Sequence, residues 1–294
     1  MKKSLSLLDY FDTVFKGIGQ IMLQENRWTG ILFFVGLLVG SWPCAIACLL
    51  ASIVGLVTAQ LCHYNVSEIK SGLYGFSPSL VGVALTFYYQ PTGLIWFLIV
   101  IGSMVAAMLQ HFFLKRNIPV FTLPFIIVSW GLIFMINKWG KTPASILFQT
   151  PHSIASYDPY LIPLRGFGQV IFQGHFLSGT FFVMGVLVNR PVAALYGLLG
   201  ALLGAGIASG LGQNLEFIYA GLFSFNTVLT AFVFAGNNKS DMVWVMIGII
   251  FTILIQYFLV RYHLFDVVGG VLTFPFVAGT WFTLILQQLF LKKA

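Results

Sequence analysis

The sequence contains two copies of one design, and this internal repeat restricts the fold more than any other feature. When the chain is offset by 149 residues, nine of the 24 positions in residues 17–40 are identical to those in residues 166–189. Two further motifs repeat in the same order: Gly72-Leu-Tyr-Gly-Phe76 with Gly221-Leu-Phe-Ser-Phe225 at the same offset, and Thr122-Leu-Pro-Phe125 with Thr273-Phe-Pro-Phe276 two residues further out of step. Shared composition alone would not preserve this order, so the chain divides into a first repeat, 1–149, and a second repeat, 150–294.

The composition of the repeats indicates that they lie in lipid. Apolar residues make up 59% of the chain and charged residues only 8%, whereas an average soluble protein carries about 25% charged residues. This balance excludes an ordinary soluble domain, a disordered chain and a nucleic-acid-binding protein. Because a transmembrane helix needs about 20 apolar residues, we expect an all-α integral membrane protein with short loops.

Each repeat offers five apolar segments that we interpret as membrane spans. They are approximately residues 29–40, 43–62, 72–88, 92–113 and 118–136 in the first repeat, and 178–189, 192–210, 219–235, 243–260 and 264–288 in the second. Residues 10–24 and 160–173 precede them and are too short and too polar to cross, so each is predicted to form a re-entrant half-helix. Because five is an odd number, the repeats would have opposite orientations, an arrangement that commonly places a substrate site at the midplane between them.

The distribution of basic residues predicts the orientation of the chain. With the N-terminus in the cytoplasm, eleven Lys and Arg residues fall on the inner side of the predicted spans and four on the outer side. This bias follows the positive-inside rule, and an even number of spans places both termini in the cytoplasm. The net charge of +7 is then explained by topology and needs no anionic partner.

The chain carries no recognisable catalytic pattern. We find no Ser/His/Asp constellation, no Walker loop and no paired carboxylates, and most acidic residues and histidines fall at or near the ends of predicted spans or in loops. Cys44 and Cys48 are one helical turn apart but have no His or acidic partner nearby in the sequence. We therefore expect neither an enzyme nor a bound cofactor or metal.

Neutral polar and aromatic side chains recur at equivalent places in the two repeats. Gln20 and Gln169 lie on the two short segments, and each amide offers a carbonyl acceptor and two N–H donors without charge. A lone Gln or Phe would often serve helix packing alone, but recurrence of the whole set in both repeats argues against packing as its sole role. The other members of the set lie near predicted helix breaks: Phe76, Leu80 and Thr122 in the first repeat, and Phe225, Leu229 and Thr273 in the second.

The motifs of the first repeat resemble those of a known membrane family. Gly72-Leu-Tyr-Gly-Phe-x-Pro-x-Leu-Val-Gly82 followed by Phe121-Thr-Leu-Pro-Phe125 is similar to the urea transporter family of bacteria and of vertebrate kidney and erythrocytes. The resemblance covers both repeats. It implies a homotrimer in a bacterial inner membrane, with a separate urea pore in each protomer, lined by two re-entrant helices and holding three consecutive urea sites.

The resemblance also implies a role for individual residues. The family's outer slot corresponds to Gln20, Leu23 and Phe76, its inner slot to Gln169, Phe172 and Phe225, and its narrow middle to Leu80, Thr122, Leu229 and Thr273. Two positions depart from the family pattern. Leu23 stands where relatives often have Phe, and Gln169 stands where some bacterial relatives have a carboxylate.

The chemistry of urea fits these residues, since urea is planar, neutral and polar. Gln carbonyls and Thr hydroxyls can offset the roughly 2–7 kcal/mol that an unsatisfied buried amide costs, while apolar walls accept the faces of the molecule. The partners expected are thus urea, membrane lipid and two further copies of the chain. The alternatives are a facilitator for short amides, ammonia or water; an ion-coupled secondary transporter, which normally needs a buried ionisable group; and a membrane scaffold protein.

Overall fold

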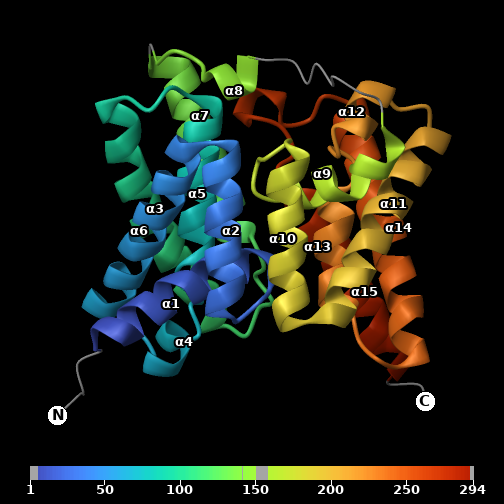
Figure 1. Ribbon diagram of the computed structural model, residues 1–294, viewed down its shortest axis with the longest axis horizontal. Helices are drawn as coiled ribbons and strands as arrows, with labels where there is room; N and C mark the ends of the chain where they lie inside the picture. Colours follow the sequence, from blue (N-terminus) through green and yellow to red (C-terminus); the bar gives the residue numbers. More distant parts are fainter. Residues whose placement is uncertain (1–5, 141, 150–157, 292–294) are drawn as a thin grey trace.

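The chain folds as a bundle of helices. The computed structural model describes residues 6–140, 142–149 and 158–291, and within these ranges it contains helices, turns and one isolated antiparallel bridge between Tyr89 and Ala144. Figure 1 shows the helices of the first repeat packed on one side of the molecule and those of the second repeat on the other. The all-α class expected from the sequence is confirmed.

The elements follow one another along the chain with these bounds. The first repeat contains α1 (Leu7–Gly19), η1 (Gln20–Met22), α2 (Arg27–Gly40), α3 (Trp42–Leu61), α4 (Val66–Lys70), α5 (Phe76–Tyr88), α6 (Gly93–Leu114), α7 (Leu123–Trp139) and α8 (Ile146–Gln149). The second contains η2 (Pro159–Leu161), α9 (Ile162–Gln169), α10 (Phe176–Asn189), α11 (Pro191–Gly210), α12 (Leu215–Tyr219), α13 (Phe225–Phe234), α14 (Lys239–Arg261), η3 (Asp266–Val268) and α15 (Phe274–Leu291).

Helix starts are set by local hydrogen bonds that recur in the two repeats. Asn65 begins α4, and its side chain accepts a hydrogen bond from the backbone N–H of Ser67 at 3.0 Å. Asn214 begins α12 in the same way, accepting from Glu216 N–H at 2.9 Å. An Asn in this position satisfies an N–H that has no partner within the helix, so the sequence fixes equivalent starts in both halves.

The membrane spans differ from the predicted set in length. Four helices, α3, α6, α11 and α14, have 20–23 residues and are long and apolar enough to cross a membrane. The other predicted spans correspond to shorter apolar helices. The 13 residues of α5 would extend about 20 Å, less than the ~30 Å hydrocarbon core of a bilayer. The predicted span 72–88 begins with a turn, and 219–235 begins at the last residue of α12 and continues into a turn. The apolar helices of these spans start only at Phe76 and Phe225.

Two glycines explain why these spans are broken. Gly72 has φ of +80° and Gly221 has φ of +81°, a conformation that glycine adopts without strain. A Cβ atom at Gly72 would lie 2.4 Å from the backbone nitrogen of Gly17, and one at Gly221 would lie 2.6 Å from that of Gly166. The turns therefore press directly against the short helices α1 and α9, and only glycine fits there.

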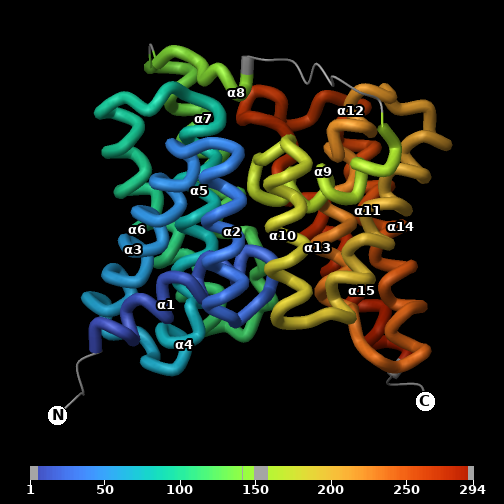
Figure 2. Tube along the Cα trace, in the orientation of Figure 1, coloured from blue at the N-terminus to red at the C-terminus, as the bar shows by residue number. Residues whose placement is uncertain are grey.

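The two repeats meet across α2 and α10, which lie side by side at the centre of Figures 1 and 2. The ring centroids of Phe33 and Phe182 are 5.3 Å apart in an edge-on arrangement. Each ring approaches a glycine of the opposite helix, because a Cβ at Gly36 would lie 2.5 Å from Phe182 and one at Gly185 would lie 2.7 Å from Phe33. Small residues at these positions allow the helices to pack closely.

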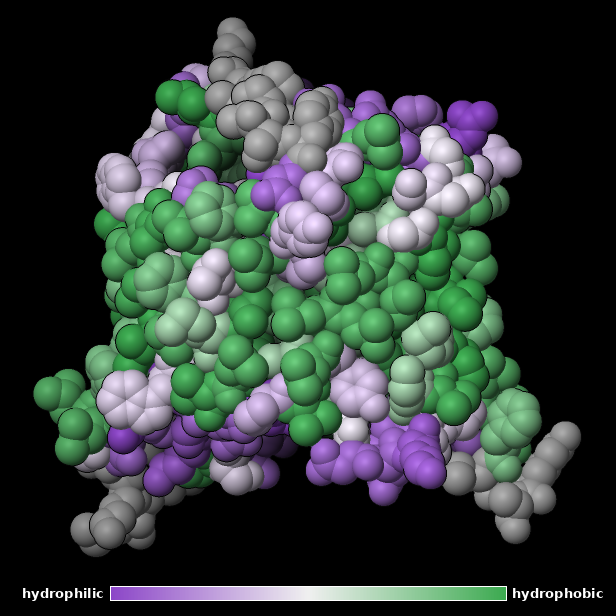
Figure 3. Space-filling model, turned by 45° about the vertical axis from the view of Figure 1, so that its right-hand side comes forward, coloured by the Kyte–Doolittle hydropathy of each residue, from purple (hydrophilic) through white to green (hydrophobic). Residues whose placement is uncertain are grey.

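The outer surface matches the expected surroundings. Figure 3 shows hydrophobic residues in a broad band across the face in view and hydrophilic residues gathered at its two ends. Large apolar side chains are exposed, including Trp42 at 62% and Phe97 at 61%. A soluble monomer rarely exposes a continuous apolar surface of this extent, so lipid is the solvent for this band.

The two ends of the molecule can be distinguished by the chain itself. We call the end at which α1 begins and α15 finishes the terminal end, and α4 also lies there (Figure 1). The short helix α12, which occupies the equivalent place in the second repeat, lies at the opposite end (Figure 1).

Candidate functional site

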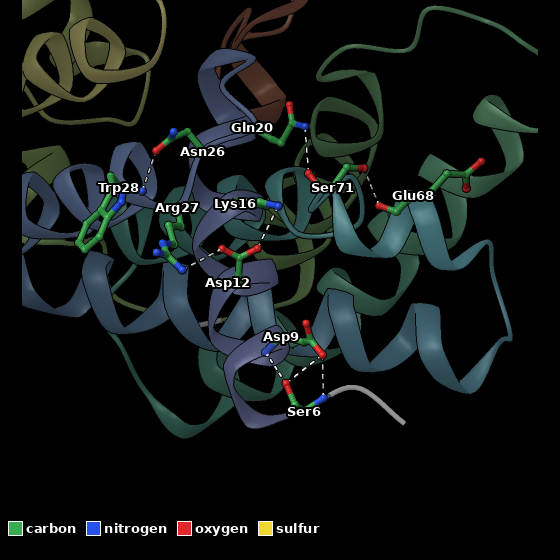
Figure 4. Close-up of polar contacts among 10 residues, drawn as sticks. All are labelled: Ser6, Asp9, Asp12, Lys16, Gln20, Asn26, Arg27, Trp28, Glu68 and Ser71. Carbon is green, nitrogen blue, oxygen red and sulfur yellow. Dashed lines mark hydrogen bonds and ion pairs between the residues drawn. The ribbon is translucent and has the colours of Figure 1, made fainter. Parts of the chain in front are cut away.

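The side chains of Gln20 and Gln169 form equivalent contacts at opposite ends of the molecule. The Gln20 Nε2 donates to the backbone carbonyl of Ser71 at 3.0 Å, as Figure 4 shows, and the Gln169 Nε2 donates to that of Ala220 at 3.0 Å. Neither amide oxygen has a hydrogen-bond partner among the residues that the structure describes. Each glutamine is thus held in place by its nitrogen, while its oxygen is available to accept from a solute.

The chain turns back sharply just after each glutamine. Leu23 has φ of +60° and Phe172 has φ of +58°, and their backbone nitrogens donate to the carbonyls of Gln20 at 3.0 Å and Gln169 at 3.2 Å. The short helices α1 and α9 therefore end inside the molecule and return. The structure thus brings each glutamine and the third residue after it into one tight turn.

The second-repeat residues line a cavity of about 390 Å³. Gln169, Phe172, Phe225 and Thr273 all lie on its wall, so the structure brings together four residues that the sequence analysis assigned to one slot and to the middle. Their aromatic neighbours come from both repeats, since the ring centroids of Phe87 and Phe172 are 5.2 Å apart. The remaining lining residues are Tyr88, Val170, Phe217, Leu222, Phe223, Gln256, Val260, Asp266, Gly269, Gly270, Val271 and Leu272.

The first-repeat residues lie at the terminal end. Phe76 is 5% exposed and belongs to the main hydrophobic core, and Leu23 packs against that core. Gln20 contacts Ser71, the residue that follows α4. Gln20 therefore bonds to the chain just before the turn that leads into α5, as Gln169 bonds to the chain just before the turn that leads into α13.

The two threonines meet in the interior. The Oγ1 atoms of Thr122 and Thr273 are 2.7 Å apart and hydrogen-bonded, and each threonine is 3% exposed. Their position depends on the preceding residues, Phe121 and Leu272, whose φ values are +46° and +47°. Leu80 and Leu229 are each 1% exposed in the same core cluster.

Two tryptophans connect the repeats beside the threonine pair. The Trp130 Nε1 donates to the Gly270 carbonyl at 2.9 Å, and the Trp281 Nε1 donates to the Pro119 carbonyl at 2.7 Å. Because each bond runs from one repeat to the other, the pair fixes the position of both turns that precede the threonines. Trp130 and Trp281 occupy equivalent positions of the two repeats, at the same offset of 151 residues as Thr122 and Thr273.

The two slots lie toward opposite ends of the molecule, so the orientation of the chain in the membrane determines which slot is outer and which is inner. The Gln20 slot lies near α4 at the terminal end, and the Gln169 slot lies near α12 at the opposite end (Figure 1). If both termini are cytoplasmic, the Gln20 slot faces the cytoplasm. On that orientation, the labels outer and inner that the resemblance gave to the two slots would be exchanged.

Several polar residues near the slots were missed from the sequence. Arg165 is 9% exposed, and its Nη1 donates to the Tyr219 carbonyl at 3.0 Å. The Asn226 Nδ2 donates to the Gln256 Oε1 at 3.1 Å and to the Leu272 carbonyl at 3.3 Å. The sequence offered a signal for Arg165, because this residue lies one helical turn before Gln169. It offered none for Gln256, because the apolar pattern of its predicted span does not distinguish this residue from its neighbours.

One acidic residue at the terminal end is paired with two basic residues. Figure 4 shows Asp12 between two basic side chains, and its carboxylate lies 2.9 Å from Lys16 Nζ and 3.7 Å from Arg27 Nη1. Among the described residues, no group of three or more His, Cys, Asp or Glu side chains could hold a metal ion. The site therefore offers hydrogen bonds and aromatic faces to a solute.

Comparison with known proteins identifies one family model and several relatives that match most of the chain. A family model described as "Urea transporter" matches residues 11–288. Proteins named "Urea transporter 1" from Capra hircus and Ovis aries are each 29% identical to the chain over 251 residues, and that of Rattus norvegicus is 27% identical over the same length. Each match covers 80% of this chain and 65% of the relative, so the chain spans slightly less than two thirds of these relatives.

Proposed function

This chain belongs to the urea transporter family, and from that membership we propose that it conducts urea passively across a membrane, between the Gln20 slot and the Gln169 slot. The names of the family and of the relatives describe transporters and not enzymes. The proposed path passes the ten residues assigned from the sequence, with the threonine pair at its middle.

The observation that carries this proposal is the repeated geometry of the two glutamines. In both halves the amide nitrogen is bound to a backbone carbonyl at 3.0 Å, which leaves the amide oxygen to accept. Urea presents four N–H donors, so an oriented acceptor at each end matches its edge. Aromatic rings beside Gln169, from Phe172 and Phe225, can accept the flat apolar face of the molecule.

The threonine pair supplies the polar groups of the middle. Urea that enters this region replaces the hydrogen bond between Thr122 and Thr273, whose oxygens are 2.7 Å apart, with bonds to both hydroxyls. A hydroxyl can both donate and accept, so each threonine can meet either the carbonyl or an amino group of urea. This exchange keeps the hydrogen bonds satisfied and keeps binding weak enough for exit.

The residues of the path favour a channel for neutral solutes over an ion-coupled carrier. All ten are uncharged, so an ion would lose its hydration without a counter-charge, at a cost far above that of a neutral amide. An ion-coupled transporter normally places an ionisable group or a cation site at this depth. We therefore propose passive flux, with short amides, ammonia or water as the alternative solutes.

We extend the proposal to the setting of the protein. The chain would form a homotrimer in a bacterial inner membrane, as the family resemblance implies, with inverted repeats and both termini in the cytoplasm. The excess of basic residues on one side of the spans supports this orientation. The opposite placement of α4 and α12 supports the inversion (Figure 1).

The experiment that tests the function uses purified protein in proteoliposomes, with stopped-flow light scattering under urea gradients. Urea flux should exceed that of empty vesicles and should be unchanged by an imposed proton or sodium gradient. Parallel gradients of acetamide, formamide and ammonia identify the preferred solute. Flux that follows the ion gradient would overturn the passive mechanism, and flux of the other solutes without urea flux would overturn the assignment of urea.

A further inference from the structure

A buried positive charge lies beside the Gln169 slot, and it has no part in the hydrogen bonding of urea described above. Arg165 occupies the position one helical turn before Gln169 on α9, so the two side chains share a face of that helix. The guanidinium of Arg165 binds the Tyr219 carbonyl at 3.0 Å, and the amide of Gln169 binds the next carbonyl along the chain, Ala220, at 3.0 Å. The charge is therefore fixed within about 10 Å of the slot, given the length of one helical turn.

This charge is poorly compensated. Arg165 is 9% exposed, and the ion pairs found in residues 6–140, 142–149 and 158–291 do not include it. The carboxylate of Asp158, which also accepts a hydrogen bond from the backbone N–H of Tyr160 at 2.9 Å, offsets the charge only in part, because it forms no ion pair with Arg165. Water and counter-ions screen a buried charge less than an exposed one, so the field of Arg165 reaches the slot.

The equivalent charge at the terminal end is different. Lys16 lies one turn before Gln20, at the position that matches Arg165 in the repeat. Its Nζ lies 2.9 Å from the carboxylate of Asp12, and its side chain is 24% exposed. The charge of Lys16 is thus offset locally and screened by solvent, and the two slots differ in the field that a solute meets.

On the basis of the proposed function, we propose that Arg165 is a specificity-determining residue that excludes planar cations of urea-like shape, such as guanidinium, from the Gln169 slot. Guanidinium has the flat three-branched frame of urea, with an amino group in place of the carbonyl oxygen and a positive charge. Shape alone therefore separates the two poorly. Two like unit charges about 10 Å apart, at an effective dielectric constant of about 20, lower binding of the cation by about tenfold.

The wall of the cavity beside the Gln169 slot also carries an acidic side chain. Asp266 lies on the cavity wall, and its carboxylate is 2.9 Å from His263 Nδ1. A carboxylate on the cavity wall attracts cations, and because its side chain is 60% exposed, solvent screens this attraction. Arg165 is buried beside that slot, whereas His263 is 80% exposed at the side chain.

The test measures inhibition of urea flux by guanidinium chloride in proteoliposomes, against sodium chloride at equal concentration. In wild-type protein, guanidinium should inhibit no more than sodium. Arg165→Gln removes the charge and keeps an N–H donor for the Tyr219 carbonyl, and it should lower the guanidinium concentration needed for half inhibition by about tenfold. Arg165→Lys keeps the charge and should behave as wild type. Lys16→Gln is the matched control and should leave guanidinium inhibition as weak as in wild type.

The outcomes separate this inference from the proposed function. Absence of urea flux in wild-type protein would overturn the function itself. Urea flux with equal guanidinium inhibition in Arg165→Gln and wild type would overturn the role of Arg165 alone. If Arg165→Gln does not fold, wild-type protein still decides the matter, because inhibition by guanidinium as strong as that by neutral methylurea would show that the slot does not exclude the cation.

Discussion

At the residue scale, the threonine pair lies at the middle of the proposed path, and the two hydroxyls are hydrogen-bonded to each other. Thr122→Val keeps the shape of the side chain and leaves the Thr273 hydroxyl without its partner at 2.7 Å. Urea that passes the middle then also has one polar group without a partner, which costs about 1–3 kcal/mol, and each 1.4 kcal/mol added to a barrier slows the rate about tenfold. We expect urea flux to fall about tenfold in Thr122→Val and similarly in Thr273→Val, measured by stopped-flow light scattering at equal protein density.

A matched control and a double variant sharpen this prediction. Thr283 is a buried threonine on α15 whose hydroxyl donates to the carbonyl of Gly279 in its own helix at 2.8 Å, so Thr283→Val should keep wild-type flux. The double variant Thr122→Val with Thr273→Val leaves neither hydroxyl unpaired and should recover stability but not flux. Wild-type flux in both single variants would remove the threonines from the path.

Leu23 offers a second test at this scale, because its partner in the repeat is Phe172. Both residues have φ near +60°, so the second repeat already accommodates a Phe in this strained conformation. Leu23→Phe should narrow the Gln20 slot. Since one methyl group in a tight pocket is worth about 1–3 kcal/mol, the ratio of methylurea to urea flux should fall at least about fivefold.

The control for Leu23 is the reciprocal change. Phe172→Leu widens the other slot and should raise the ratio of methylurea to urea flux. Equal loss of both fluxes in Leu23→Phe would instead mean that Leu23 only packs against the core. Competition between the two solutes in one assay distinguishes these results.

Most of the candidate residues could be found from the sequence because the repeat doubles every signal. Gln20 and Gln169 mark the same position in two halves, and the structure gives them the same hydrogen bond. Arg165 also has a basic partner in the repeat, Lys16, but the burial of Arg165 could not be predicted from that match, since Lys16 has a different environment. A charge was read as a marker of topology, and its burial depends on tertiary packing that the sequence does not display.

At the element scale, the turn before α5 determines where the slot lies. The apolar pattern of residues 72–88 predicts a continuous span, but Gly72 turns the chain at φ of +80° against the backbone of Gly17. Hydropathy does not register a positive φ or a close backbone approach, so the helix length was overestimated. The glycines themselves were visible in the motif, and they carry the information that hydropathy lacks.

The same turn yields a prediction about stability. Gly72→Ala would place a Cβ 2.4 Å from the Gly17 nitrogen in a left-handed conformation, which costs about 1–3 kcal/mol for the backbone alone. We expect a lower unfolding temperature in detergent and loss of urea flux. Gly131→Ala is the control, because nothing lies within 4 Å of a Cβ built on that glycine of α7. An unchanged unfolding temperature in Gly72→Ala would contradict the packing described for the turn.

At the scale of the whole molecule, the two repeats are held together by equivalent contacts that cross between them. Trp130 binds Gly270 and Trp281 binds Pro119, so each repeat fixes the turn that carries the threonine of the other. The duplication in the sequence predicted that two such turns exist. It could not predict that the threonines touch, because that contact depends on how the repeats face one another.

The orientation of the molecule in the membrane decides which slot is outer, and a native cysteine can report it. Cys62 is exposed and follows α3 directly before the terminal-end helix α4, whereas Cys44 and Cys48 are buried. If the termini are cytoplasmic, a membrane-impermeant maleimide should label Cys62 in inverted vesicles and leave it unlabelled in intact cells. Cys62→Ser should abolish labelling, since the other two thiols lie inside the protein.

A second reporter tests the opposite end of the fold. Lys138→Cys, on the last turn of α7 and introduced into the Cys62→Ser variant, should be labelled in intact cells and left unlabelled in inverted vesicles. Labelling of Cys62 from outside the cell would instead place the Gln20 slot on the outer face, as the resemblance first suggested, and the positive-inside bias would then have misled the topology.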